Sequence, residues 1–156
     1  MSPLGAGLRQ PDRRSCGAAC MVMAEALTPP VEDAATLAPR FAERVLATHR
    51  RLTSWRLHGR PQLPYPRALG TPPWAVAREL GALTGRRHRV RLVRHLARTA
   101  GPPSSGALYV GSRLLPRHVV LLVGEGRCYE PSSGRVLPVD GPLGGWRHRW
   151  FAITPR

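Results

Sequence analysis

One short segment near the start of the chain combines a cysteine with groups that can assist its attack on a carbonyl. Gln10 stands six residues before Cys16. Cys16 is followed by Gly17 and then by a run rich in helix-forming residues that ends at Leu27. Ser15 has the side chain of an N-cap, so we predict that a buried helix begins at Cys16. The dipole and free N–H groups of such a helix start favour the thiolate, which is the reactive form of cysteine.

A general base for this cysteine has to come from one of six histidines. His118 differs from the others because it opens the most apolar run of the chain, His-Val-Val-Leu-Leu-Val. Such a run predicts a rigid central strand with the imidazole at its edge. The other five stand in arginine-rich or polar surroundings: His49, His58, His88, His95 and His148.

A carboxylate that can orient His118 follows from the next turn. Gly124-Glu125-Gly126 predicts a hairpin with a three-residue loop, in which Val123 faces Arg127. In this register Glu130 shares a face with His118 and lies diagonally across from it. A carboxylate in that position accepts the imidazole N–H and fixes its tautomer. A loop of two or four residues would instead turn Glu130 away.

These motifs together resemble the bacteriocin-processing branch of the papain-like cysteine peptidases. That family has a Gln six residues before a Cys-Gly, a later His that opens a strand, and an Asp-Pro followed shortly by a Gly. The resemblance implies that Cys16 is the nucleophile and that His118 is the general base. It also implies that the side chain of Gln10 donates to the oxyanion hole.

The resemblance has one departure and a limited extent. Glu130, followed by Pro131 and then by Gly134, stands where the family has Asp, which lengthens the orienting side chain by one methylene. The similarity covers the N-terminal segment and roughly residues 107–139. The double-glycine leader specificity of the transporter-fused relatives is not carried over to this chain.

The chemistry predicted for these residues is acyl transfer on a peptide or protein substrate. A Cys16–His118 thiolate–imidazolium pair attacks the carbonyl, and Gln10 with the Cys16 N–H stabilises the oxyanion. His118 then protonates the leaving amine, and water releases the acyl-enzyme. The reaction of such a thiol protease requires no metal and no cofactor. Deamidation, transglutamination and toxin-type cleavage share the thioester intermediate, so these alternatives remain open.

A structural zinc site is an alternative reading of the same residues. Cys16 and Cys20 are four residues apart and can share a helix face, and Cys128 faces the same way as His118 in the predicted hairpin. The chain lacks the short paired spacing of structural zinc sites. Cys20 and Cys128 also suit an apolar core. We therefore favour the catalytic interpretation.

The charge of the chain raises a third possibility, a nucleic-acid-binding module. The formal net charge is +15, and all 24 basic residues are arginine. The absence of lysine and asparagine is typical of a bias that acts on the whole composition, which favours a general surface charge over a dedicated patch. The densest stretch contains no aromatic residue for base stacking, so we expect nucleic-acid binding to be weak at most; its arginines are Arg86, Arg87, Arg89, Arg91, Arg94 and Arg98.

The order of elements predicts a single α+β domain over residues 1–156. After the Cys16 helix we expect an interrupted helix over 31–51, an irregular connection or lid over 52–70, and a helix capped by Thr71 and ended by Gly85. A strand over 87–93 and a short helix over 94–99 follow. The remaining chain predicts a mostly antiparallel sheet packed against the Cys16 helix, with strands over 107–111, 117–123, 127–130, 135–139 and 149–154.

Three cysteines, an odd number, argue for reduced thiols over a disulfide framework. The sequence has neither a run of membrane-spanning length nor the apolar core of a secretory signal at its start. We therefore expect a cytoplasmic protein, with export by a signal-independent route left open. The oligomeric state is not predicted.

Overall fold

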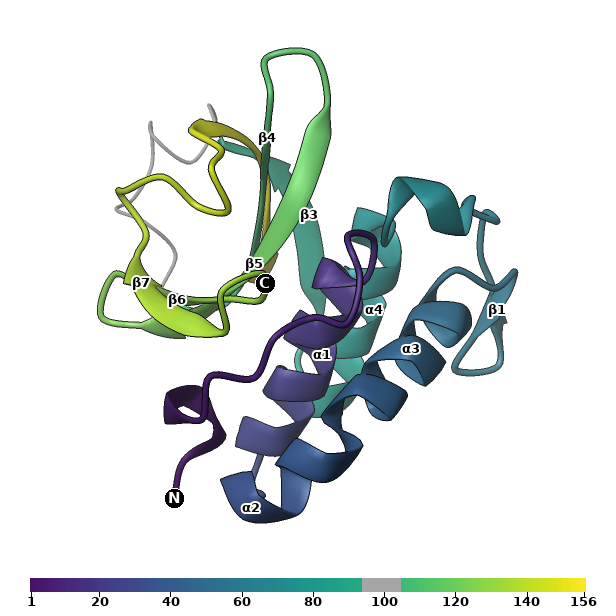
Figure 1. The fold of residues 1–156 in the computed structure, drawn as a ribbon. Helices are drawn as coiled ribbons and strands as arrows, with labels where there is room; N and C mark the ends of the chain where they lie inside the picture. Colours follow the sequence, from purple (N-terminus) through teal and green to yellow (C-terminus); the bar gives the residue numbers. More distant parts are fainter. Residues whose placement is uncertain (94–104) are drawn as a thin grey trace.

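The computed structural model describes residues 1–93 and 105–156, which form a layer of helices against an antiparallel sheet (Figure 1). The helical layer holds α1 (Cys16–Leu27), the short α2 (Ala34–Leu37), α3 (Phe41–Leu52) and α4 (Pro73–Thr84). This arrangement confirms the α+β class and the antiparallel sheet. The helix predicted over 94–99 lies outside the described residues.

The sheet has six strands, and every neighbouring pair is antiparallel. In spatial order they are β3 (His88–Leu92), β8 (His148–Pro155), β4 (Gly106–Gly111), β5 (Pro116–Gly124), β6 (Arg127–Glu130) and β7 (Arg135–Pro138). Strand β5, which carries the predicted base near its start, is therefore an interior strand. Each predicted strand is present, with ends that differ by one residue or less.

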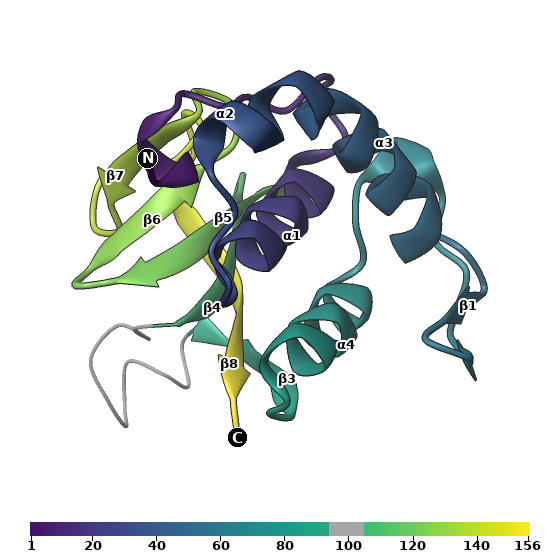
Figure 2. The ribbon, with the colours of Figure 1, turned by 90° about the horizontal axis from the view of Figure 1, so that it is seen from below.

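Helix α1 lies between β5 of the sheet and α3 (Figure 2). All eight residues from Cys16 to Met23 are buried, because this helix carries a single charged side chain, Glu25, near its end. Burying apolar side chains on all sides of a helix fixes its axis and its rotation. The position of the Cys16 end of α1 relative to the sheet is thus set by the core.

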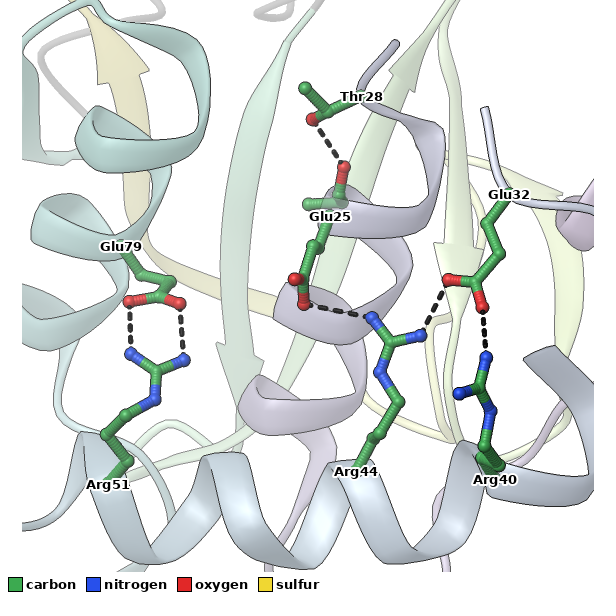
Figure 3. Close-up of polar contacts among 8 residues, drawn as sticks. Glu25, Thr28, Glu32, Arg40, Arg44, Arg51 and Glu79 are labelled. Carbon is green, nitrogen blue, oxygen red and sulfur yellow. Dashed lines mark hydrogen bonds and ion pairs between the residues drawn. The ribbon is translucent and has the colours of Figure 1, made fainter. Parts of the chain in front are cut away.

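Arginines of α3 hold the neighbouring helices by ion pairs (Figure 3). Arg44 binds Glu25 of α1 at 3.0 Å and Glu32 of the α1–α2 connection at 2.6 Å. Arg51, near the end of α3, makes two bonds of 2.8 and 2.5 Å to the buried Glu79 of α4. Ion pairs thereby attach α3 to both α1 and α4.

The helical segments differ from the sequence prediction in two details. The predicted helix over 31–51 is interrupted as expected, by a 3-10 turn at Ala38–Arg40 that contains Pro39. Thr71 does not cap α4, whose N-cap is Pro72, and the Thr71 side chain instead packs on Gly17. Gly85 ends α4 in the left-handed conformation, as predicted.

The connection over 52–70 contains a small hairpin that the sequence analysis missed. Strand β1 (Arg56–Leu57) pairs with β2 (Arg60–Pro61) through a turn in which His58 and Gly59 both have positive φ. The hairpin is joined to α4 by a bond of 2.6 Å between His58 Nε2 and Glu79 Oε2. A 3-10 turn at Arg67–Leu69 then leads to α4.

The β5–β6 hairpin has the predicted register along its body and a different loop at its tip. Leu121 pairs with Tyr129 and Leu122 with Cys128, as the three-residue loop required. At the tip, Gly124 pairs with Arg127, so the predicted Val123–Arg127 pair is wrong. A bulge between Leu122 and Gly124 takes up the extra residue, and the faces along the rest of the hairpin are unchanged.

Within residues 1–93 and 105–156, no helix has the length and apolar character needed to cross a bilayer.

Candidate active site

The side chains of His118 and Glu130 form a buried pair at one end of the sheet. His118 Nε2 lies 2.6 Å from Glu130 Oε1, and the two residues are 7% and 2% exposed. His118 stands near the start of β5 and Glu130 at the end of β6, which are the diagonal positions expected from the hairpin. Because Nε2 faces Glu130, the nitrogen left for a second partner is Nδ1.

The carboxylate of Glu130 is fixed by the turn that follows β6. Oε1 accepts hydrogen bonds from the Ser132 N–H at 2.8 Å and the Ser132 hydroxyl at 2.6 Å, and Oε2 accepts from the Ser133 N–H at 3.0 Å. Burial alone would raise the pKa of Glu130, but the hydrogen bonds from His118, Ser132 and Ser133 outweigh it and hold the pKa well below its usual range. Glu130 is therefore ionised wherever the protein is folded near neutral pH.

Cys16 lies beside the imidazole of His118. It is buried at the first position of α1, and both side chains line the same cleft. Burial alone would lower the pKa of His118, but side-chain interactions with Cys16 and Glu130 outweigh it and raise the pKa to about 9. The arrangement thus favours a protonated imidazole between a sulfur and a carboxylate.

The loop before Cys16 is organised by Asp12, which the sequence analysis did not single out. Asp12 Oδ1 accepts hydrogen bonds from the N–H groups of Arg14 at 2.8 Å and Ser15 at 2.9 Å. Burial opposes ionisation of Asp12, yet these backbone donors lower its pKa. Ser15 occupies the N-cap position but makes no capping bond with its side chain, so the predicted Ser15 cap is wrong in that respect.

Gln10 lines the same cleft as Cys16 and His118. Its Nε2 donates to the Asp12 carbonyl at 2.6 Å, which uses one of its two amide protons. Its backbone N–H donates to the Pro131 carbonyl at 2.8 Å. The segment before α1 is thereby attached to the turn that holds Glu130, and the four residues selected from the sequence come together.

The N-terminal segment and the turn after β6 meet so closely that only glycine fits between them. A Cβ on Gly134, where φ is +68°, would lie 2.5 Å from the Gly7 carbonyl oxygen. The Tyr129 hydroxyl donates to the Leu8 carbonyl at 2.7 Å in the same contact. The Gly that follows the Glu-Pro pair is therefore required by packing, which explains its place in the motif.

The cleft around Cys16 has a volume of about 790 Å³. Aromatic side chains form much of its wall, so it suits a ligand with apolar groups. Tyr65 and Trp74 pack edge to face with ring centroids 5.6 Å apart. The lining also includes Trp146 and Phe151 together with the exposed Leu115.

Thr71 is a lining residue that the sequence analysis assigned to a helix cap. It is 4% exposed, and a Cβ built on Gly17 would lie 2.6 Å from the Thr71 Cβ. The residue after Cys16 must therefore be glycine. The Thr71 carbonyl accepts the Tyr109 hydroxyl at 2.8 Å, which fixes this wall of the cleft to β4.

Gly144 covers the ring of His118 and was also missed. A Cβ at this position, where φ is +57°, would approach His118 Cδ2 to 2.7 Å. Leu143 and Trp146 form a bridge that closes the turn containing Gly144 and Gly145. The Gly-Gly pair between two large apolar residues was a turn signal in the sequence, but nothing there showed which side chain the turn would cover.

The other two cysteines lie in the core and are attached to separate elements. Cys20 Sγ contacts the Val119 carbonyl at 3.5 Å on the helical side of the sheet. Cys128 Sγ contacts the Leu137 carbonyl at 3.6 Å and belongs to the apolar cluster on the other side. Burial raises the pKa of Cys20 well above its ordinary value and that of Cys128 to about 11. In the described part of the chain, no three His, Cys, Asp or Glu side chains are grouped to hold a metal ion.

None of the described arginines of the arginine-rich stretch lines this cleft. Arg89 and Arg91 belong to β3, which pairs with β8. Arg94 and Arg98 lie outside the described residues.

Comparison of the chain with protein-family models, with curated proteins and with solved structures finds no significant match.

Proposed function

We propose that this chain is a cysteine-nucleophile amide hydrolase of the papain-like, bacteriocin-processing type. The observation that supports it most is the buried series Cys16, His118 and Glu130 at the wall of a cleft, with the sulfur at the start of a buried helix. A carboxylate that orients an imidazole beside a nucleophile is the arrangement that acyl transfer needs.

Each residue has a defined part in the proposed reaction. The Cys16 thiolate attacks the carbonyl carbon of a peptide or protein amide, and the negative charge moves to the carbonyl oxygen. That oxygen accepts from the second amide proton of Gln10 and from the Cys16 N–H. Protonated His118 gives its proton to the leaving amine, and the amine departs to leave a thioester.

Hydrolysis of the thioester completes the cycle. Neutral His118 takes a proton from water as the water attacks the thioester carbonyl, and the thiol leaves as thiolate. Glu130 remains ionised throughout and stabilises the imidazolium in both steps. An amine in place of water would give transfer, and a glutamine side-chain amide in place of a peptide bond would give deamidation, so these reactions share the same intermediate.

Turnover of pooled fluorogenic peptide amides tests this function. The wild-type chain is expected to release the amine, and Cys16→Ala is expected to release none. Cys20→Ala is the matched control, because it removes a buried thiol one helical turn away whose one hydrogen bond among the described residues is to a backbone carbonyl. Equal turnover by wild type and Cys16→Ala would contradict the proposed function, and loss of turnover in Cys20→Ala alone would point to a different nucleophile.

A further inference from the structure

A second groove, with a volume of about 770 Å³, shares Trp74 as a lining residue with the candidate active site. The β1–β2 hairpin, helix α4 and strand β3 form its walls. Its outstanding feature is positive charge. Six arginines and two histidines line it: Arg60, Arg78, Arg86, Arg87, Arg89, Arg156, His58 and His88.

This positive charge is not balanced by carboxylates of the chain. None of the six arginines forms an ion pair among the described residues. Glu79, beside Arg78 in the sequence, is buried and already engaged by Arg51 and His58. The sequence from 94 to 104 contains no Asp or Glu that could supply a partner. The groove thus offers unneutralised guanidinium groups to an anion.

Two of the basic side chains that line the groove are held by hydrogen bonds. His58 is fixed by Glu79 at 2.6 Å, and Arg78 donates to the Pro61 carbonyl at 2.9 Å. These two contacts attach the hairpin to α4. Side chains held on a rigid frame lose less entropy when they bind a ligand than free surface arginines do.

Apolar side chains among the arginines indicate whether the groove suits an acidic polypeptide or a nucleic acid. Leu57, Ala77 and Val90 line the groove together with Trp74, and Val90 is 39% exposed on β3 between Arg89 and Arg91. A polypeptide with acidic and apolar side chains matches both kinds of lining. A phosphodiester backbone offers charge to the arginines but no aliphatic groups to these residues.

Trp74 lines both this groove and the cleft that contains Cys16. A chain that occupies the groove is therefore directed past Trp74 toward the nucleophile. We propose that the groove is a substrate subsite that binds an acidic, partly apolar segment of the protein whose amide bond enters the cleft. This inference rests on the proposed amide hydrolysis, because only then is the bound segment part of a substrate.

Binding is tested with the full chain carrying Cys16→Ala, so that the probe is not cleaved. The probe is a short fluorescent peptide in which Glu alternates with Leu, followed by anisotropy. A peptide with Gln in place of Glu controls for apolar binding, and a short oligodeoxythymidine strand of equal charge tests the nucleic-acid alternative. The acidic peptide is expected to bind more tightly than both.

A double variant of the groove carries Arg87→Gln and Arg89→Gln. The matched control is a double variant outside the groove that carries Arg50→Gln and Arg127→Gln. All four side chains are exposed, and both double variants lose the same net charge. The groove variant is expected to bind the acidic peptide roughly 5- to 10-fold more weakly, whereas the control changes affinity less than about 2-fold. Arg60→Gln, on the opposite wall, provides a second test if the β3 variant melts at a lower temperature than wild type.

Three results would overturn the inference: equal weakening in both double variants, no weakening in the groove variants, or tighter binding of the oligonucleotide than of the peptide. These outcomes are separable from failure of the proposed function. If Cys16 gives no turnover but the groove binds acidic peptide selectively, the enzyme proposal fails. If Cys16 gives turnover while the groove variants bind like wild type, only the subsite is wrong.

Discussion

The hydrogen bond of 2.6 Å between His118 Nε2 and Glu130 Oε1 joins two adjacent strands at the end that faces Cys16. It is buried on both sides, and the carboxylate is also held by three donors from the turn after β6. The imidazole therefore has a fixed tautomer and orientation before any substrate binds.

The first prediction concerns the charge of Glu130. Glu130→Gln is expected to slow turnover by roughly 100-fold or more while leaving measurable activity, because an orienting residue can be partly replaced. Cys16→Ala is expected to leave none. The measurement is kcat/KM for a peptide amide. Glu125→Gln at the hairpin tip and Asp140→Asn are exposed controls and are expected to retain wild-type activity; a loss in Asp140→Asn with none in Glu130→Gln would reverse the assignment.

The second prediction separates the donor role of Gln10 from its packing. Gln10→Ala is expected to slow turnover by about 100-fold or more, the usual effect of losing one oxyanion-hole donor. Gln10→Glu keeps the length of the side chain but has no N–H to donate, so it is expected to be at least as slow. Thermal melts report folding of both variants. Wild-type turnover in Gln10→Glu would show that the amide protons of Gln10 are not used.

The third prediction concerns alkaline pH. Because the pKa of His118 is raised from 6.5 to about 9, the proton that the leaving amine needs is retained up to that pH. We expect kcat/KM to fall as the pH rises through about 9. The same raised pKa adds stability that is complete below pH 6.5 and is lost as the pH rises through about 9.

Glu130→Gln provides the control for this pH dependence. Removing the carboxylate takes away an interaction that raises the pKa of His118, so the alkaline fall in activity is expected at lower pH. The depressed pKa of Glu130 itself contributes stability above its unfolded value of 4.5, and this contribution is lost as the pH falls. An alkaline limb that does not move in Glu130→Gln would mean that a group other than His118 titrates.

The fourth prediction uses the two glycines of the turn over His118. Gly144→Ala is expected to displace the imidazole and abolish most activity, since its Cβ would lie 2.7 Å from His118 Cδ2. Gly145 also has a positive φ, of +82°, but a Cβ there meets nothing within 4 Å. Gly145→Ala is therefore expected to lose only about 1–2 kcal/mol of stability for its backbone conformation and to keep its activity. Equal loss of activity in both would assign the effect to the turn as a whole.

The sequence was sufficient to predict most of the fold because its local signals agree with one another. The Cys16 helix carries a single charged residue, and strands β4 to β8 each end at, or directly before, a Gly or a Pro. The alternation along β5 and β6 placed His118 and Glu130 on one face even though the loop prediction was wrong at its tip. The turn is tighter than predicted, and a bulge at Val123 that was not predicted adds one residue to the strand. The two differences compensate, so the register of the rest of the hairpin is as predicted.

What could not be predicted depends on contacts between distant segments. Asp12, Thr71 and Gly144 are ordinary loop residues in the sequence, and each is important only for what packs against it. The β1–β2 hairpin was missed because its strands have two residues each, too short for any periodicity. It is attached to α4 by contacts between distant residues, such as the bond between His58 and Glu79, which are 21 positions apart.

The central claim is that Cys16 carries the acyl group of a substrate, and mass spectrometry of the intact chain tests it directly. After brief incubation with peptide amides and an acid quench, we expect an acyl adduct that maps to Cys16 and is released by hydroxylamine, as a thioester is. The adduct is expected to be absent in Cys16→Ala and present in Cys20→Ala and Cys128→Ala. An adduct distributed over all three cysteines, or one that maps to another residue, would contradict the account.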